Sequence, residues 1–206
     1  NTLVGIASNS KGFTATALAI LADEGKLSFD DKVTQYLPEF QMYDPYVTRN
    51  ITIKDLITHR AGLGLGQGDL MFFPEGGSLT VNDIIHNVRY LKPENDFRTT
   101  LDYNNIMFIV AGEIIHRVSG LSWAEFIEQR ILKPVGMSSS FGSFNRAKAA
   151  KVTNIIDAHA PVDGKVVAVP HDWNETANAA GGIMSNELSA SKNPMDEFRE
   201  RVTEKL

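Results

Sequence analysis

The beginning of the chain, residues 5–15, most limits the folds open to it, because it has the pattern of a loop that runs into a helix. Apolar residues follow at helical spacing, namely Phe13, Ala17, Ile20 and Leu21. Gly25 offers a stop after them. Ser8 and Lys11 are three positions apart, so on a helix they share one face. Ser8 would then lie at the amino end, where free N–H groups and the helix dipole favour developing negative charge.

The Ser8–Lys11 pair suits nucleophilic catalysis. A serine hydroxyl needs a base within hydrogen-bond reach, and a lysine is such a base where burial or a neighbouring cation lowers its pKa. The backbone N–H of Ser8 would help to bind an oxyanion. The plain alternatives are a helix cap for Ser8 and a solvated first-turn lysine for Lys11. A second Ser-x-x-Lys, at Ser189 and Lys192, lacks a long apolar-periodic segment behind it.

Composition indicates one globular domain. The chain has 206 residues, of which 43% are hydrophobic and 22% charged, enough for a single core over residues 1–206. We expect a mostly helical region over 30–150, a hairpin and a glycine turn over 151–190, and a charged helix over 191–206 whose placement the sequence does not set.

Charge and cysteine content exclude several classes of protein. The net charge of −5, with no basic block, argues against nucleic acid as a partner. The absence of cysteine excludes disulfides and thiolate metal sites. No apolar run approaches the ~20 residues of a membrane span, so stable membrane insertion is not predicted for this stretch. Nothing in the sequence sets an oligomeric state.

Capping signals and periodicity predict further helices. They cover residues 33–37, 50–59 with Thr52 as cap, 80–91 with Thr80 as cap, 103–119 with Gly120 as stop, and 122–132 with a capping box. Asp163-Gly164 between two β-prone runs predicts a hairpin. Residues 179–185 read as a glycine turn that enters a helix. The glycine-rich segment 62–68 is interpreted as a mobile loop and not a phosphate site, and residues 71–73 after it line either a cleft or the core.

Tyr103 and Asn105 are candidates to assist a serine–lysine pair. Something must pass the proton to the leaving group, and something must orient the substrate. Both residues lie at or just before a predicted helix start, where side chains project into a cleft. The plain alternatives are a half-buried aromatic for Tyr103 and a capping residue for Asn105.

The chain resembles the serine β-lactamase/penicillin-binding protein superfamily. The class C β-lactamase-like branch, with its β-lactamases, esterases and D-amino-acid peptidases, is the most similar. The resemblance covers about residues 5–185. Several segments agree in order: Ser8-Asn-Ser-Lys11-Gly-Phe-Thr-Ala15, Glu24-Gly-Lys-Leu-Ser-Phe-Asp-Asp31, Tyr36-Leu-Pro-Glu-Phe40, Ile53-Lys-Asp-Leu-Ile-Thr-His-Arg-Ala-Gly-Leu63, Tyr103-Asn-Asn105, Leu132-Lys-Pro-Val-Gly-Met137 and Ala180-Gly-Gly-Ile-Met-Ser185.

The resemblance implies an α+β (α/β) fold, with a helical domain beside part of an antiparallel-sheet α/β sandwich. By position, Ser8 would be the nucleophile that forms an acyl-enzyme, and Lys11 its paired base. Tyr103 would be the proton shuttle, and Asn105 would bind the substrate and Lys11. The substrate would be a small molecule or peptide with an amide or ester bond: a β-lactam, a D-amino-acid peptide or an ester. The compartment favoured by the resemblance is periplasmic or secreted.

Two departures keep an alternative open. The family's third motif, Lys/His-x-Gly on an inner strand, is not found. The family's amino-terminal helix and first strands are missing as well. We therefore expect the sequence to be incomplete at both ends. A catalytically silent member that binds a peptide or cell-wall ligand is therefore the alternative. The five histidines lack metal-site spacing, so no metal or cofactor is expected. His59 resembles a structural position of the family, and His171-Asp172 would edge the cleft.

Overall fold

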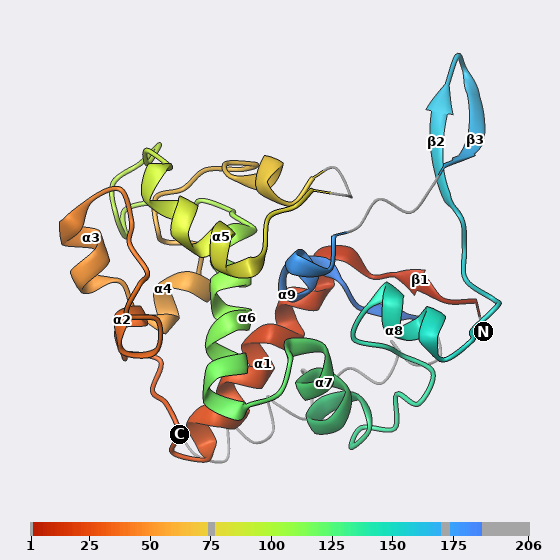
Figure 1. The fold of residues 1–206 in the computed structure, drawn as a ribbon, viewed down its shortest axis with the longest axis horizontal. Helices are drawn as coiled ribbons and strands as arrows, with labels where there is room; N and C mark the ends of the chain where they lie inside the picture. Colours follow the sequence, from red (N-terminus) through yellow and green to blue (C-terminus); the bar gives the residue numbers. More distant parts are fainter. Residues whose placement is uncertain (1, 74–76, 170–173, 187–206) are drawn as a thin grey trace.

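Two long helices form the centre of the fold. The computed structural model describes residues 2–73, 77–169 and 174–186, and Figure 1 shows its helices gathered around α1 and α6. The longer elements are α1 (Ser10–Asp23), α3 (Pro45–Asn50), α4 (Ile53–Ile57), α5 (Val81–Asn87), α6 (Ile106–Ser119), α7 (Trp123–Ile127), α8 (Phe144–Ala149), β2 (Ala158–Val162) and β3 (Lys165–Val169). The shorter ones are β1 (Val4–Gly5), η1 (Ala7–Asn9), α2 (Val33–Tyr36), η2 (Asp69–Met71), η3 (Val88–Tyr90), η4 (Glu128–Leu132), η5 (Glu175–Ala177), α9 (Asn178–Gly181) and β4 (Met184–Ser185).

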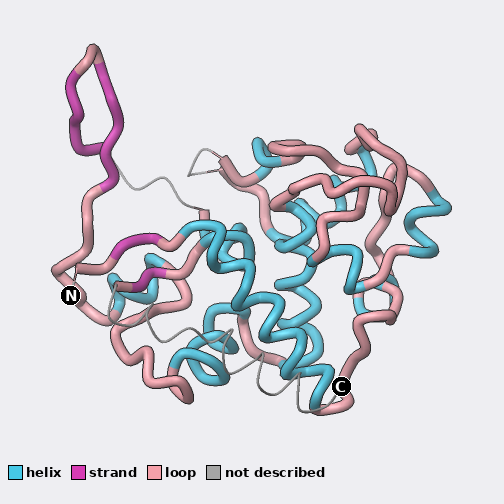
Figure 2. The backbone as a smooth tube through the Cα atoms, turned by 180° about the vertical axis from the view of Figure 1, so that it is seen from behind, coloured by secondary structure: helices cyan, strands magenta, loops and turns pink. Residues whose placement is uncertain are grey.

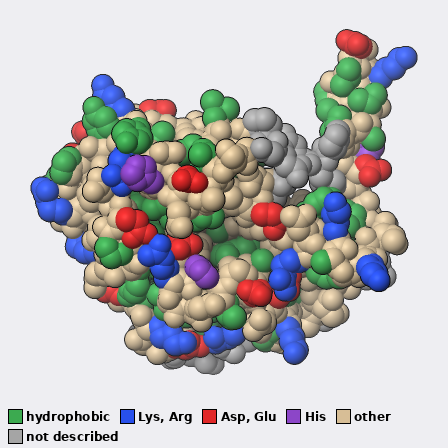
Figure 3. All heavy atoms as spheres, viewed as in Figure 1, with side chains coloured by type: hydrophobic (Ala, Val, Ile, Leu, Met, Phe, Trp, Pro, Cys, Tyr) green, Lys and Arg blue, Asp and Glu red, His purple; other side chains and the backbone are tan. Residues whose placement is uncertain are grey.

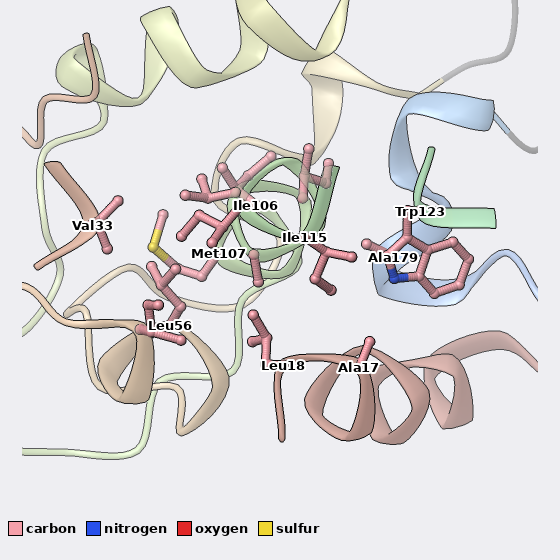
Figure 4. Packing of buried hydrophobic residues seen from close by; sticks show 14 of the residues in the cluster. Ala17, Leu18, Val33, Leu56, Ile106, Met107, Ile115, Trp123 and Ala179 are labelled. Atoms are coloured by element: carbon pink, nitrogen blue, oxygen red, sulfur yellow. The ribbon is translucent and has the colours of Figure 1, made fainter. Parts of the chain in front are cut away.

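Helix α6 is buried along most of its length. Figure 4 shows it among α1, α4 and α9, with Ile106, Met107 and Ile115 directed into the core. It ends at Gly120, whose φ of 75° is the left-handed conformation expected of a helix stop. At Gly112 an added Cβ would lie 2.6 Å from the Ala179 Cβ, so only glycine allows α6 to approach α9 this closely.

The predicted caps of three helices are confirmed, and each is a full capping box. In each, the cap hydroxyl accepts the N–H of the residue three positions on, and that residue's carboxylate accepts the cap's N–H. The pairs are Thr52–Asp55 for α4, Thr80–Asp83 for α5 and Ser122–Glu125 for α7. These local bonds set where each helix begins, because they satisfy N–H groups that the helix itself leaves free.

Several boundaries differ from expectation. The predicted helix 80–91 is α5 followed by the 3₁₀ turn η3, and the predicted helix 122–132 is α7 followed by the π-helical turn η4. Helix α3 was not predicted, although Asp44 caps it and Pro45 occupies its first position, which together are a recognisable start signal. The predicted helix over 191–206 and the second Ser-x-x-Lys lie outside the described residues.

A short antiparallel pair joins the two ends of the described chain. Val4 pairs with Ser185 and Gly5 with Met184, which places β1 beside β4 (Figure 2). The prediction that the glycine turn over 179–185 enters a helix is therefore wrong, since it leads out of α9 into β4. The reason is tertiary: the N–H of Ile6 donates to the Ile183 carbonyl at 3.0 Å, so this segment extends to meet the start of the chain.

The predicted hairpin around Asp163-Gly164 is confirmed as β2 and β3. Both turn residues have positive φ, 49° and 75°, as a two-residue hairpin turn requires. The hairpin projects from the body of the molecule in Figures 1 and 2, and Val166 is 76% exposed. The fold thus combines helices with small antiparallel sheets, as the α+β class predicts.

No helix within the described part of the chain is alone long and apolar enough to cross a bilayer. Among the described residues, only α6 and the stretch Trp123–Leu132 taken together have the length and composition of a membrane span, and the two are bent by 73° relative to each other.

Candidate active site

Ser8 lies in the 3₁₀ turn η1, between strand β1 and helix α1. Its neighbour Ala7 has a φ of 47°, an unusual left-handed conformation for a residue other than glycine. The cap position of α1 is occupied by Asn9, with no side-chain capping bond. The reading of Ser8 as a plain helix cap is therefore wrong, and its exposed hydroxyl is free for other contacts.

Lys11 is buried, with only 7% of its surface exposed. Its Nζ donates to three acceptors: Ser8 Oγ at 3.2 Å, Asn105 Oδ1 at 2.7 Å and the Ala180 carbonyl at 2.8 Å. All three acceptors belong to the protein, so hydrogen bonds to protein groups hold the Nζ in place next to Ser8. The reading of Lys11 as a solvated surface lysine is therefore wrong.

Tyr103 approaches Ser8 from the other side. Its hydroxyl donates to Ser8 Oγ at 2.6 Å, across 95 positions of sequence. The ring of His59 stacks on the Tyr103 ring with centroids 4.6 Å apart, and Lys11 Nζ lies 4.8 Å from the centre of the Tyr103 ring. Ser8 Oγ thus has two titratable groups within hydrogen-bond reach.

Asn105 occupies the cap position of α6 but makes no side-chain capping bond. Its Oδ1 accepts from Lys11, and its Nδ2 donates to Asp69 Oδ2 at 2.9 Å. The structure therefore brings all four predicted site residues into one cluster, in which each touches at least one of the others.

The segment 62–68, expected to be a mobile loop, is tied to the start of α6. The side-chain amide of Asn104 donates to the carbonyls of Gly64 at 3.0 Å and Gln67 at 2.9 Å. The aromatic residues that follow belong to the core rather than to a cleft, since Phe72 is 1% exposed and Phe73 packs against the core.

Helix α9 completes the wall behind Lys11. Besides the Ala180 carbonyl that receives Lys11, its Ala179 carbonyl accepts from the Thr14 hydroxyl at 2.7 Å. Trp123 Nε1 in turn donates to that hydroxyl at 3.0 Å. This chain of bonds fixes the position of α9 against α1.

Sequence reasoning missed Asp69 and the two α9 carbonyls, and it gave His59 no role beside Tyr103. A single aspartate after a glycine run and a backbone carbonyl carry no spacing signal. His59 does carry one unusual feature, a φ of 57°, but this is visible only in the structure. Its Nδ1 accepts the Asn104 N–H at 3.2 Å, which holds the ring in place. The suggested cleft residues His171 and Asp172 lie outside the described residues.

Burial governs the ionisation of the two neighbours of this cluster. Burial raises the pKa of the Asp69 carboxyl, against the opposing effects of the Asn105 hydrogen bond and the Lys11 charge. Burial, and after it the charge of Lys11, lowers the pKa of the His59 imidazole. His59 therefore favours the neutral form next to Lys11.

A separate hollow of about 380 Å³ opens between α6, α7 and α9 and is visible near the middle of Figure 3. Two charged residues that line it already form ion pairs, Glu113 with Arg117 and Arg146 with Glu128. None of its lining residues belongs to the Ser8 cluster. In the described ranges no group of three or more His, Asp or Glu side chains is arranged to hold a metal ion.

Comparisons with known proteins identify the family of the chain. A family model described as Beta-lactamase matches residues 1–187. The unguisins hydrolase ungD' of Aspergillus campestris is 32% identical over 155 residues, which make up 73% of this chain and 29% of that protein. The chain thus spans less than a third of the length of this curated relative.

Two solved structures illustrate the fold that this chain shares with known proteins. The octameric penicillin-binding protein homologue from Pyrococcus abyssi superimposes with a TM-score of 0.74 at 29% identity, covering 93% of this chain and 44% of that one. A class C beta-lactamase superimposes with a TM-score of 0.71 at 25% identity, covering 93% of this chain and 49% of that one. The chain therefore belongs to the beta-lactamase family, within the superfamily of serine beta-lactamases and penicillin-binding proteins.

Proposed function

We propose that the protein is a serine hydrolase that cleaves an amide or ester bond through an acyl-enzyme on Ser8. The observation that carries the proposal is the environment of Ser8 Oγ, which lies 2.6 Å from the Tyr103 hydroxyl and 3.2 Å from Lys11 Nζ. Both distances are within reach for proton transfer, and an activated serine requires such a partner.

The proposed reaction assigns one task to each residue. Ser8 Oγ attacks the substrate carbonyl and forms the acyl bond, while its proton leaves through Tyr103 to the departing nitrogen or oxygen. Lys11 is the base paired with Ser8. Asn105 binds the substrate's carbonyl or amide and holds Lys11. Water then attacks the acyl carbonyl and releases Ser8 by the reverse proton path.

The Ser8 N–H supports this reading as a donor for the oxyanion. Among the hydrogen bonds of the described residues none uses this N–H, and it lies at the amino end of the 14-residue helix α1. A free N–H at that position stabilises negative charge that develops on the carbonyl oxygen.

The substrate class is proposed from the relatives. One relative is named as a hydrolase of unguisins, one solved structure as a penicillin-binding protein homologue and another as a beta-lactamase. We therefore propose that the substrate contains a peptide or lactam amide. A simple ester is the alternative, and the two labelling reagents below help to distinguish lactam from ester chemistry. A periplasmic or secreted location stays a prediction from the resemblance.

The test is intact-protein mass spectrometry of the full natural chain after incubation with a fluorophosphonate and, separately, with a penicillin. We expect a single adduct in the wild type and none in Ser8→Ala. Ser139→Ala, which changes an exposed serine, is the control that should label like the wild type. A folded wild type that labels with neither reagent would refute the hydrolase and favour a silent, ligand-binding member of the family.

A further inference from the structure

Asp69 is a carboxylate beside the Ser8 cluster to which the proposed reaction gives no task. It begins the turn η2 directly after the glycine run, and its Oδ2 accepts from Asn105 Nδ2 at 2.9 Å. Its Oδ1 is buried without a hydrogen-bond partner, the one side-chain atom of this kind among the described residues. A buried, unpaired carboxylate oxygen costs free energy, so its presence calls for an explanation.

The contact of the other oxygen, Oδ2, with Asn105 indicates a task for Asp69 that would offset this cost. The side-chain amide has one end that accepts and one that donates. Lys11 Nζ donates to this amide, and Asp69 Oδ2 accepts from it. One orientation alone satisfies both neighbours, with Oδ1 toward Lys11 and Nδ2 toward Asp69. The reverse orientation would place N–H groups against the lysine and an oxygen against the carboxylate.

We propose that Asp69 is a positioning residue that fixes the Asn105 amide, so that its carbonyl faces Lys11 and its second N–H remains available to the substrate. This inference rests on the proposed serine hydrolase function, since the second N–H matters only where a substrate carbonyl binds. Asp69 itself touches neither Ser8 nor the reacting atoms and acts through Asn105.

The glycine-rich segment is built to bring Asp69 to this place. Gly66 and Gly68 have φ values of 75° and 89°, which side chains other than glycine rarely adopt, and the Asp69 N–H donates to the Gly66 carbonyl at 3.0 Å. At Gly68 an added Cβ would lie 2.8 Å from Ile106 Cγ1, at the first residue of α6. The segment therefore packs against the helix start that carries Asn105, and Asp69 arrives next to it.

A double-mutant cycle tests whether Asp69 acts through Asn105. The measured quantity is the rate constant of Ser8 labelling by the fluorophosphonate in the full natural chain. We expect Asp69→Ala to lower it about tenfold or more, the effect of removing a charge-assisted hydrogen bond. Asp69→Asn keeps an acceptor oxygen and should restore most of the rate. In the Asn105→Ala background, Asp69→Ala should cost nothing further.

Asp102 provides a matched control. Its Oδ1 accepts from the side-chain amide of Asn95 at 2.7 Å, so it forms the same kind of pair without contact to Lys11. Asp102→Ala, which removes a half-buried aspartate that also accepts from the Thr100 hydroxyl, should change the labelling rate by no more than about twofold, because Asp102 makes no contact with Asn105. A full loss from Asp69→Ala in the Asn105→Ala background would show a structural role and overturn the proposal.

A second readout does not depend on turnover. The side-chain amide protons of Asn105, assigned by their disappearance in Asn105→Ala, should show one slowly exchanging proton in wild type and in Asp69→Asn, and lose it in Asp69→Ala. An unchanged amide signal in Asp69→Ala would overturn the proposal. A wild type that fails to label while keeping the protected amide would instead count against the hydrolase, so the two failures are distinguishable.

Discussion

The starts of the two 14-residue helices differ from those of α4, α5 and α7. The three shorter helices use their polar cap side chains on their own backbone, in boxes such as Thr80 with Asp83. At the starts of α1 and α6, the cap residues Asn9 and Asn105 make no side-chain capping bond. Instead, Asn105 reaches across to Lys11. The local bond at α6 comes from the preceding residue, because Asn104 Oδ1 accepts the Met107 N–H, and Asn105 is left for contacts between helices.

Packing explains why the two long helices tolerate cap residues that make no side-chain capping bond. A side-chain cap contributes about 1 kcal/mol, whereas burying one large apolar side chain contributes roughly 1.5–3 kcal/mol. Nine of the fourteen residues of α6 are buried, and the Met107 N–H of its first turn donates to Asn104 Oδ1 at 3.3 Å, so α6 does not need a capping bond from Asn105. Short helices with few buried residues depend more on their caps. The comparison shows that this site lies where core packing stabilises the helices, so that a polar side chain such as Asn105 can contact Lys11 instead of capping its own helix.

The largest effect is expected from Lys11→Met. The change removes the base but keeps much of the side-chain length, so Ser8 labelling should fall by roughly 10²–10⁴ while the protein remains folded. The change also leaves Asn105 Oδ1 and the Ala180 carbonyl without their Lys11 donor, so stability should fall, by about 1–3 kcal/mol for each unpaired acceptor. The rate of fluorophosphonate labelling and the thermal unfolding midpoint measure the two effects.

Lys54→Met is the control for this prediction, since Lys54 is an exposed lysine of α4 and should leave both quantities unchanged. An unfolded Lys11→Met protein would contradict the comparison, because it would make the α1 start depend on its polar contacts as the capped helices do.

An intermediate effect is expected at a capped start. Thr80→Ala removes the hydroxyl that accepts the Asp83 N–H, and should lower the free energy of unfolding by about 1 kcal/mol. Ser8 labelling of the folded protein should not change. Urea unfolding measures the first quantity, and Thr80→Ser, which keeps the hydroxyl, should recover it. A lower labelling rate in folded Thr80→Ala would show that the cap of α5 also affects the reactivity of Ser8.

The smallest effect is confined to acid pH and concerns the α4 start. Burial would raise the pKa of the Asp55 carboxyl, but hydrogen bonds from Arg98 and Thr52 outweigh it and hold the pKa below the usual 3.8. A lowered carboxyl pKa gives stability that is present above pH 3.8 and is lost as the pH falls through the folded-state pKa. Urea unfolding from pH 7 to 2 should therefore show a steeper acid loss in wild type than in Asp55→Asn. Equal slopes would refute this assignment.

Much of the local structure could be predicted because its causes are local. Capping boxes join residues three apart, the Gly120 stop depends on one residue, and the Asp163-Gly164 turn depends on two. The boundaries that failed, such as the glycine turn that leads into β4, depend on a partner strand at the other end of the chain. The residues around β4 do not by themselves indicate that β1 is their partner.

The candidate site divides in the same way. Spacing alone paired Ser8 with Lys11, the place of Tyr103 and Asn105 at a predicted helix start made them candidates, and the resemblance to a family assigned their roles. Asp69 had no signal of either kind, because its contact with Asn105 joins positions 36 apart through a glycine-rich segment whose path is set by packing.

The sequence by itself determined most of the helices, the caps of α4, α5 and α7, and the Ser8–Lys11 spacing, since these follow from interactions over three or four residues. Only the tertiary structure decided that Lys11 meets Asn105 and the Ala180 carbonyl, 94 and 169 positions away. Those contacts exist because burial of apolar side chains packs α1, α6 and α9 against one another. The hydrophobic effect that drives this packing is not directional, so the meeting of particular polar groups depends on how the whole core fits together.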